Sequence, residues 1–289
     1  MFKYIYIYNK IVFTHKNNNF NKTGIIIIII IIKMQHHCLY KYTKRILFLS
    51  SRHQYYSSAA TRSTKNAKKF NRKGNNKGKR KLKGKTASSS QWLQRQDKDP
   101  FVAESIKDGY PSRAAYKLID IQKQFNVIQK GFKILDLGCC PGSWLMVAKK
   151  FSKNSRVVGI DLIEFDPPID GVEIIQGDFE DENVLHHLSE LLNGKVDLIL
   201  SDMSPNLTGM QDIDQINMMS LQSSIIEFLP THLKTSGNLV TKTFRGQYDK
   251  EIFETLKENF KSVKRYKPPA SRSQSKEIYM ISKGFKQQQ

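Results

Sequence analysis

Lys242 stands in the segment LVTKTFRG (residues 239–246), whose other residues have the composition of a buried parallel strand. Moving an ammonium group out of water costs several kcal/mol unless partners compensate its charge or its pKa falls. Partial burial and a second cation nearby both lower the pKa of a lysine, and such a lysine can serve as a base. The position of Lys242 therefore points to proton-transfer chemistry.

A turn with two glycines supplies a second candidate site. The segment LDLGCCPGSW (residues 135–144) has the pattern of a strand, a turn and the start of a helix. Gly138 permits a tight turn of the backbone, and Gly142, which has no Cβ, lets a ligand approach closely. The spacing departs from G-x-G-x-x-G, so the segment does not favour a dinucleotide site.

Carboxylates stand at the ends of four predicted strands, at Asp136, Asp161, Asp178 and Asp202. Asp161 suits hydrogen bonding to a ribose diol, and Asp178 can face an adenine edge. Several carboxylates would repel a pyrophosphate but fit a ligand that combines ribose, adenine and a positive charge. S-adenosylmethionine, with its sulfonium, is such a ligand. Taken singly, each acid could instead be a helix cap or a turn residue of a non-catalytic α/β domain.

Strand-like and helical segments alternate from Ser112 onward. The strand-like segments are FKILDLG, RVVGIDL, VEIIQGDF, VDLILSDM, GNLVTKTF and EIYMISKGF. The helical segments are SRAAYKLIDIQKQF, with Ser112 as N-cap, then GSWLMVAKKFS, ENVLHHLSELL, QINMMSLQSSIIEFLPTHL and KEIFETLKENF. This alternation predicts an α/β fold with a mostly parallel, doubly wound, Rossmann-like sheet. Ligands of such sheets bind beyond the carboxyl ends of the strands.

Acidic and basic residues are distributed unevenly along the chain. Asp and Glu are absent from residues 1–96, where Lys and Arg number 22, while the remainder holds 25 basic and 26 acidic residues. We therefore predict a low-complexity, transit-like segment over residues 1–64, a basic disordered linker over residues 65–96 and a folded domain over residues 97–289. The linker could contact phosphates without sequence specificity, or act as a nuclear or nucleolar localisation signal.

The first segment favours import into mitochondria. From Met34, a second candidate start, the sequence is rich in Arg, Ser and Tyr and lacks acids, which is typical of a transit peptide. The alternative is a disordered tail that carries no targeting signal. The eight isoleucines at residues 25–32 would span about 12 Å as a helix, against a hydrocarbon core of roughly 30 Å. We therefore expect no stable membrane insertion.

Three cysteines, Cys38, Cys139 and Cys140, cannot form a disulfide framework and indicate a reducing compartment. No set of Cys and His has the spacing of a zinc site, and the run His36-His37-Cys38 lies in low-complexity sequence. We therefore expect no bound metal.

The segments SRAAYKL, DLGCCPGSW, QGDF, SDMSPN, LVTKTF and SRSQSKEIYMI stand in order within residues 97–284. Together they resemble the bacterial RrmJ/FtsJ family of ribosomal RNA ribose 2′-O-methyltransferases and its mitochondrial branch. The resemblance implies a class I S-adenosylmethionine-dependent methyltransferase fold. It also implies a cofactor site whose residues are Pro141, Gly142, Ser143 and Trp144 for the methionine part and ribose region, Asp161 for the ribose, Asp178 for the adenine and Asp202 near the methyl group.

Two features depart from the family pattern. Ser143 replaces a second glycine, and Cys139-Cys140 replaces two alanines of the bacterial members. All three side chains are small enough to fit the same turn.

The same resemblance implies a catalytic tetrad of Lys117, Asp202, Lys242 and Glu277. Two lysines and two acids in otherwise apolar segments would also satisfy one another's charges if brought together. Our hypothesis is that Lys242 accepts the proton of a ribose 2′-hydroxyl as that oxygen attacks the sulfonium methyl. Asp202 would orient Lys242 and the methyl donor, while Lys117 and Glu277 would position the ribose. Singly, Lys117 could be a solvated helix residue and Glu277 an ordinary edge-strand acid.

The sequence SDMSPNLTGMQDID (residues 201–214) is closer to the bacterial and mitochondrial ribosomal type than to the SDGAPDVTGLHD of the cytosolic transfer RNA branch. We therefore expect an rRNA (uridine-2′-O-)-methyltransferase that acts on mitochondrial large-subunit ribosomal RNA and supports ribosome assembly. Two alternatives stay open. The protein could methylate transfer RNA, or it could be an assembly factor whose methyl transfer is dispensable.

Contacts with RNA should rely on phosphates and shape. Candidate phosphate contacts flank the predicted site at Arg113, Lys117, Arg245, Lys267 and Arg272. Because the folded part is near neutral, we expect its substrate to be a structured particle, an assembled large ribosomal subunit, and the protein itself to be a monomer.

Overall fold

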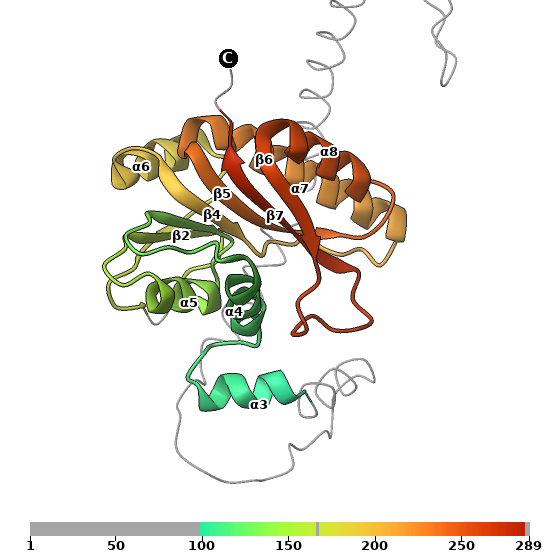
Figure 1. The fold of residues 1–289 in the computed structure, drawn as a ribbon, viewed down its shortest axis with the longest axis horizontal. Coiled ribbons are helices and arrows are strands. Elements are labelled where there is room, and N and C mark those ends of the chain that lie inside the picture. Colours follow the sequence, from blue (N-terminus) through green and yellow to red (C-terminus); the bar gives the residue numbers. More distant parts are fainter. Residues whose placement is uncertain (1–98, 166–167, 287–289) are drawn as a thin grey trace, which may run out of the picture. The chain divides into compact units, whose positions relative to one another are not determined.

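The computed structural model describes residues 99–165 and 168–286 (Figure 1). The isoleucine run, the transit-like segment, the basic linker and the domain boundaries expected at residues 64 and 96 lie outside the described residues and stay predictions. Among the described helices, none combines the length and the apolar composition that a membrane crossing requires.

A seven-stranded sheet forms the centre of the fold, with the strand order β3-β2-β1-β4-β5-β7-β6. β1 to β5 pair in parallel, and β7 runs antiparallel to both β5 and β6. The strands are β1 (Ile134–Leu137), β2 (Val157–Asp161), β3 (Glu173–Gln176), β4 (Val196–Ser201), β5 (Leu233–Phe244), β6 (Phe260–Tyr266) and β7 (Glu277–Phe285). The predicted mostly parallel, doubly wound sheet is confirmed. Its order reverses between β1 and β4, which is where open α/β sheets bind ligands.

Helices cover both faces of the sheet (Figure 1). They are α3 (Pro100–Lys107), α4 (Ala114–Phe125), α5 (Ser143–Phe151), α6 (Glu182–Leu192), α7 (Gln211–His232) and α8 (Asp249–Asn259). Leu118 of α4 and Leu145 of α5 belong to one apolar core, whereas Leu188 of α6, Ile225 of α7 and Leu256 of α8 belong to another. Each face of the sheet therefore has its own core, and α4 with α5 closes one of them.

The sequence prediction missed two elements. β6 was missed because Lys261, Lys264 and Arg265 point into solvent and mask the strand pattern, as is common at a sheet edge. α3 was missed because its 8 residues are fewer than the window of about 11–18 residues over which helical periodicity becomes recognisable. The expected N-cap at Ser112 is one residue too early, since α4 begins at Ala114, but the Ser112 hydroxyl still accepts a hydrogen bond from the Ala114 N–H at 3.2 Å.

The strand register places the predicted catalytic residues on one face. Ser201 of β4 pairs with Thr241 of β5, so the next residues, Asp202 and Lys242, stand side by side. Across β7, Lys242 pairs with Tyr279 and Phe244 pairs with Glu277. Paired residues share a face and side chains alternate along a strand, so Lys242, Tyr279 and Glu277 point the same way. The core beneath α4 includes Tyr279, which identifies that face as the one that α4 covers.

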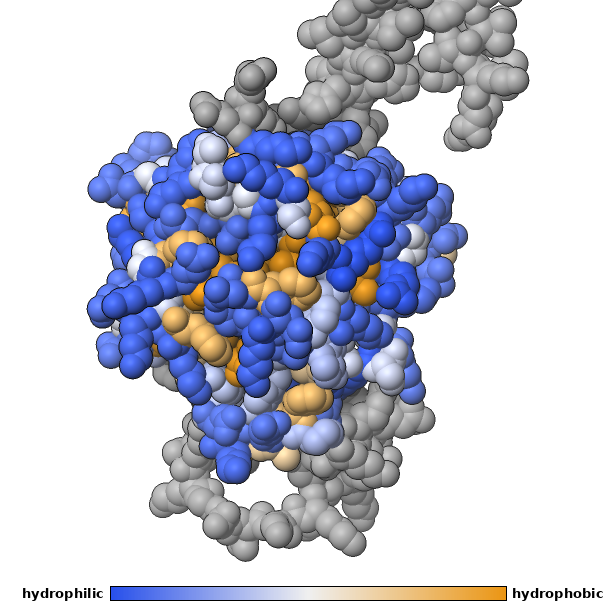
Figure 2. Space-filling model, viewed as in Figure 1, coloured by the Kyte–Doolittle hydropathy of each residue, from blue (hydrophilic) through white to orange (hydrophobic). Residues whose placement is uncertain are grey.

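Hydrophilic residues cover most of the surface seen in Figure 2, and apolar residues emerge between them. Several large apolar side chains that are more than half exposed lie in the loops after β2 and β4: Leu162, Ile163, Leu207 and Met210. These loops follow the carboxyl ends of the strands, the edge at which α/β sheets bind ligands.

Candidate active site

Four charged side chains meet where α4 crosses the carboxyl ends of β4 and β5. Lys117 Nζ lies 3.0 Å from Glu277 Oε1 and 3.6 Å from Asp202 Oδ2. Lys242 Nζ lies 3.1 Å from Asp202 Oδ1 and also donates to the main-chain carbonyl of Asp202. The four side chains are between 9% and 19% exposed. The structure therefore brings the residues of the predicted tetrad into one cluster with balanced charge, held by contacts between segments far apart in the sequence.

Tyr279 belongs to this cluster and was missed in the sequence. Its hydroxyl donates a hydrogen bond of 2.6 Å to Asp202 Oδ1, and its side chain is fully buried. Burial raises the pKa of Tyr279 well above its usual value, and the carboxylates of Asp202 and Glu277 raise it further. The phenol therefore remains a hydrogen-bond donor. The available signal was its place two residues after Glu277, on the same face of a strand.

Asp202 is the centre of the cluster. Burial alone would raise its pKa, but the ammonium groups of Lys242 and Lys117, with the hydrogen bond from Tyr279, outweigh burial and hold the pKa of Asp202 below its usual value. The carboxylate is therefore ionised at neutral pH. It can hold Lys242 by charge and by direct contact.

Lys117 reaches the cluster because the first turn of α4 is fixed to the glycine turn. Ser112 Oγ and Ser143 Oγ lie at a hydrogen-bonding distance of 2.8 Å, and Trp144 Nε1 donates to the main-chain oxygen of Ala114 at 2.9 Å. Ser143 and Trp144 are both buried. Two residues predicted to hold a cofactor therefore also position the helix that carries Lys117.

The glycine turn has the backbone conformation that its sequence predicts. Gly138 and Gly142 adopt φ values of 74° and 91°. A Cβ on Gly138 would lie 2.2 Å from Met203 Cγ, and one on Gly142 would lie 2.5 Å from Phe165 Cζ. The missing Cβ atoms therefore create a cradle, and flexible apolar side chains fill it in this structure.

A cofactor with a positive charge fits the chemistry beside this cradle. Asp136 and Pro141 line a cavity of about 20 Å³ that also borders Asp202. Asp136 Oδ2 is buried and has no hydrogen-bond partner among the described residues. Burial, followed by the charges of Asp202 and Asp161, raises the pKa of Asp136 well above its usual value. A cavity of that size holds about one water molecule, so a larger ligand has to displace side chains such as Met203.

Asp161 and Asp178 fix loops at the carboxyl edge of the sheet. Asp161 accepts hydrogen bonds from the main-chain N–H of Cys140 at 2.8 Å and of Ile163 at 2.9 Å, so it ties β2 to the glycine turn. Asp178 accepts from the N–H of Glu180 at 3.0 Å, in the loop after β3. Asp161 thus adjoins the turn, as a cofactor site would require, while Asp178 lies one strand further away.

Of the five candidate phosphate contacts, Lys117 lies in the charged cluster, and the other four divide into two groups. Arg113 donates to the main-chain oxygen of Ala270, and Lys267 donates to two further main-chain oxygens of the β6–β7 loop at 2.7 and 3.1 Å. These two side chains hold that loop beside α4. Arg245 is exposed, and Arg272, although its Nε lies 3.9 Å from Asp99 Oδ2, is 39% exposed, so these two remain better placed to meet a phosphate.

Replacing Gly142 with alanine should weaken both the fold and cofactor binding. The positive φ costs an alanine about 1–2 kcal/mol, and relief of the clash with Phe165 adds about 1–3 kcal/mol. Gly194→Ala is the matched control, because Gly194 has a φ of 97° but no atom within 4 Å of its added Cβ. Urea denaturation and calorimetric titration with S-adenosylmethionine would measure both effects. Equal losses of stability, with cofactor affinity intact in Gly142→Ala, would contradict the cradle.

Comparison with known proteins agrees with this geometry. Residues 110–285 match the model of the FtsJ-like methyltransferase family. The chain is 42% identical over 207 residues to the ribosomal RNA large subunit methyltransferase E of Gluconobacter oxydans, covering 72% of this chain and 76% of that protein. It is also 42% identical over 206 residues to the protein of the same name from Rickettsia akari, covering 69% and 90% of the two chains.

A solved structure shows the same fold. A crystal structure from Plasmodium falciparum, provisionally titled a ribosomal RNA methyltransferase, superposes with a TM-score of 0.56 at 34% identity and covers 61% of this chain and 98% of that one. The sheet order and the glycine turn define a Rossmann-like α/β fold, and the family match identifies it as a methyltransferase fold. Within that class, the chain belongs to the FtsJ-like methyltransferase family.

Proposed function

We propose that this protein is an S-adenosylmethionine-dependent enzyme that methylates the 2′-oxygen of a ribose, that of a uridine, in mitochondrial large-subunit ribosomal RNA. The observation that carries the proposal is the cluster of Lys117, Asp202, Lys242 and Glu277 beside the glycine turn. The names of the relatives support ribosomal RNA of the large subunit as the substrate. The acid-free, transit-like first segment supports a mitochondrial address.

The glycine turn would hold the cofactor. Gly138 and Gly142 place no Cβ in its cradle, from which Met203 and Phe165 would have to move, Asp161 borders the turn, and Asp136 offers a buried polar atom to a cationic group. When bound, S-adenosylmethionine supplies a methyl group on a positively charged sulfur. The sequence expectation that Pro141, Ser143 and Trp144 contact the methionine part, and Asp178 the adenine, belongs to this proposal.

Lys242 would take the proton of the ribose hydroxyl. Its Nζ lies at the carboxyl edge of the sheet, and Asp202 fixes its position through both the carboxylate and the main-chain oxygen. The amine must be uncharged when it accepts the proton. General-base catalysis of this kind contributes about 10²- to 10⁴-fold to a rate.

Lys117 and Glu277 would hold the ribose against Lys242. Their ion pair of 3.0 Å fixes both side chains at the edge of the cluster. A fixed orientation of two reacting groups can lower a barrier by about 7–11 kcal/mol, so positioning would supply more of the rate than proton transfer does.

The proposal is tested by mapping ribose methylation in mitochondrial ribosomal RNA from a strain that lacks the protein. We expect one missing mark in the large-subunit RNA, restored by the wild-type chain but not by Lys242→Ala. If the missing mark were in transfer RNA instead, transfer RNA would be the substrate. Restored ribosome assembly without the mark in the Lys242→Ala strain would favour an assembly factor. A reporter fused to residues 1–64 that stayed outside mitochondria would contradict the location.

A further inference from the structure

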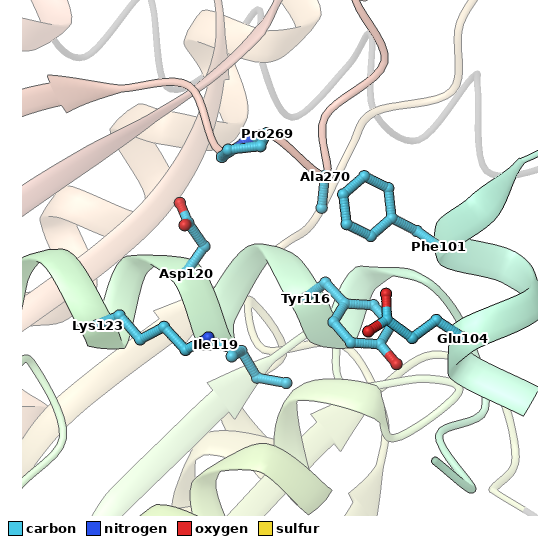
Figure 3. Close-up of a pocket in the computed structure, with 8 residues that line it drawn as sticks. All are labelled: Phe101, Glu104, Tyr116, Ile119, Asp120, Lys123, Pro269 and Ala270. Atoms are coloured by element: carbon cyan, nitrogen blue, oxygen red, sulfur yellow. The ribbon is translucent and has the colours of Figure 1, made fainter. Parts of the chain in front are cut away.

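A second cavity lies between α3, α4 and the β6–β7 loop (Figure 3). Its volume is about 180 Å³. Pockets that enclose drug-sized ligands measure about 300–1,000 Å³. The cavity is therefore of a size to receive one planar ring system rather than a whole cofactor.

Aromatic and apolar side chains form part of the cavity wall. The rings of Phe101 and Tyr116 contact each other with centroids 5.6 Å apart, and Ile119 and Ala270 also line the space (Figure 3). Base–aromatic stacking is worth about 1–3 kcal/mol per base in proteins that bind single strands. This wall suits the face of an unstacked base.

The charged groups that line the cavity are two carboxylates and the ammonium group of Lys123 (Figure 3). Asp120 projects from α4 and Glu104 from α3 (Figure 3). The Tyr266 hydroxyl donates to Asp120, and burial together with this hydrogen bond raises the pKa of Tyr266 to about 12. The phenol therefore stays protonated and fixes the Asp120 side chain. A ligand that places N–H groups toward these carboxylates would be favoured, and one that places carbonyl oxygens there would be repelled.

The cavity adjoins the charged cluster. Tyr266, which holds Asp120, pairs across β6 and β7 with Tyr279, which holds Asp202. Adjacent strands lie about 4.8 Å apart. Asp120 also follows Lys117 by three residues, or about one turn of α4. A polynucleotide whose ribose lies at the cluster would therefore carry a neighbouring base to the cavity.

We propose that this cavity receives an unpaired guanine adjacent to the nucleotide whose ribose is methylated. The inference rests on the proposed RNA substrate. Guanine presents the N1–H and N2–H donors side by side, so it can give two hydrogen bonds to one carboxylate such as Asp120. Uracil presents one N–H between two carbonyl oxygens and would meet the carboxylates unfavourably. Adenine and cytosine offer one amino group next to an acceptor, so they satisfy the site only in part.

The test measures which base the full chain prefers when it binds short single-stranded RNAs. The probes are four fluorescent pentaribonucleotides, UGUGU, UAUAU, UCUCU and UUUUU, and the measurement is the dissociation constant by anisotropy. All four carry the same number of phosphates, so the sequence-independent contribution cancels in their ratios. A well-made bidentate contact gives about 10-fold discrimination, so we expect UGUGU to bind about 10-fold more tightly than UUUUU.

Two variants assign the preference to the cavity. Asp120→Asn should reduce the ratio to less than about threefold, since an amide has one acceptor oxygen in place of two and its NH2 group would face one of the guanine donors. Glu104→Gln removes the second carboxylate, and no hydrogen bond of Glu104 to another described side chain is lost, so it serves if Asp120→Asn misfolds. Glu258→Gln, on the exposed side of α8, is the matched control and should keep the wild-type ratio. Circular dichroism checks the fold of each.

A wild-type ratio below about twofold, or a ratio unchanged in folded Asp120→Asn and Glu104→Gln proteins, would overturn the inference. The proposed function fails separately. A wild-type chain that prefers UGUGU but transfers no methyl group to large-subunit RNA would keep the base pocket and refute the methyltransferase assignment. A chain that methylates RNA without preferring UGUGU would refute the base pocket and keep the methyltransferase assignment.

Discussion

Replacing Lys242 with alanine is expected to lower the rate of methyl transfer by about 10²- to 10⁴-fold, which is the usual contribution of a general base. Asp202 would keep its ion pair with Lys117 and its hydrogen bond from Tyr279, so the cluster should persist. Single-turnover transfer of a labelled methyl group to undermethylated large ribosomal subunits measures the effect. Cofactor affinity, measured by calorimetry, should change by less than about threefold because the proposed role of Lys242 is to accept the ribose proton and not to bind the cofactor.

Two lysine variants control this prediction. Lys242→Arg keeps a positive charge, but a guanidinium does not lose its proton, so the rate should stay as low as in Lys242→Ala. Lys234→Ala removes an exposed lysine at the other end of β5, whose Nζ pairs with Asp197 at 2.8 Å, and should leave the rate unchanged. Near wild-type transfer by Lys242→Arg would show that charge alone suffices and would remove Lys242 as the proton acceptor.

Replacing Asp202 with asparagine should give the largest combined loss, in both stability and rate. The change leaves the buried ammonium group of Lys242 without its carboxylate partner and that of Lys117 paired with Glu277 alone. Removing one partner of a buried ion pair costs about 3–5 kcal/mol. The free energy of unfolding in urea at pH 7 should fall by about 3 kcal/mol, and methyl transfer should be lost because Lys242 is no longer oriented.

The direction of the Asp202 pKa shift predicts how the stability loss in Asp202→Asn changes with pH. The folded-state pKa of Asp202 lies below its unfolded value of about 3.9. The carboxylate therefore stabilises the fold fully above that value, and the stabilisation disappears as the pH falls through the lower folded pKa. The wild-type and Asp202→Asn unfolding free energies should differ most near neutral pH and converge below about pH 4. A difference that stayed constant down to pH 3 would mean that the charge of Asp202 contributes nothing.

The glycine turn and the β6–β7 loop both contact the first turn of α4, the helix that carries Lys117. Ser143 and Trp144 fix the first turn of α4 to the glycine turn, and Arg113 ties the same turn to the β6–β7 loop. A change in the glycine turn can therefore reach Lys117 through the helix. This explains why cofactor binding and ribose positioning should be coupled in variants of Ser143, although Ser143 is not part of the charged cluster.

Much of the fold could be read from local patterns. Buried parallel strands appear as short apolar runs, and amphipathic helices show a period of 3.6 residues, so several elements were predicted with nearly correct bounds: β1, β2, α5, α6, β4 and α8. α7 begins at Gln211, earlier than the predicted start at Gln215. Backbone conformation is also partly local at Gly138 and Gly142, whose residue type permits the positive φ values that the turn adopts. β6 escaped prediction because an edge strand exposes its charged side chains.

By itself, the sequence determined the strand and helix periods, the glycine turn and the presence of a lysine in an apolar strand, since these depend on neighbouring residues. Only the tertiary structure decided that Lys242 and Tyr279 face the same carboxylate, because that depends on the register between β4, β5 and β7. The cavity beside Asp120 likewise exists only once α3, α4 and the β6–β7 loop come together. Contacts between distant segments depend on packing of the whole domain, which no local pattern encodes.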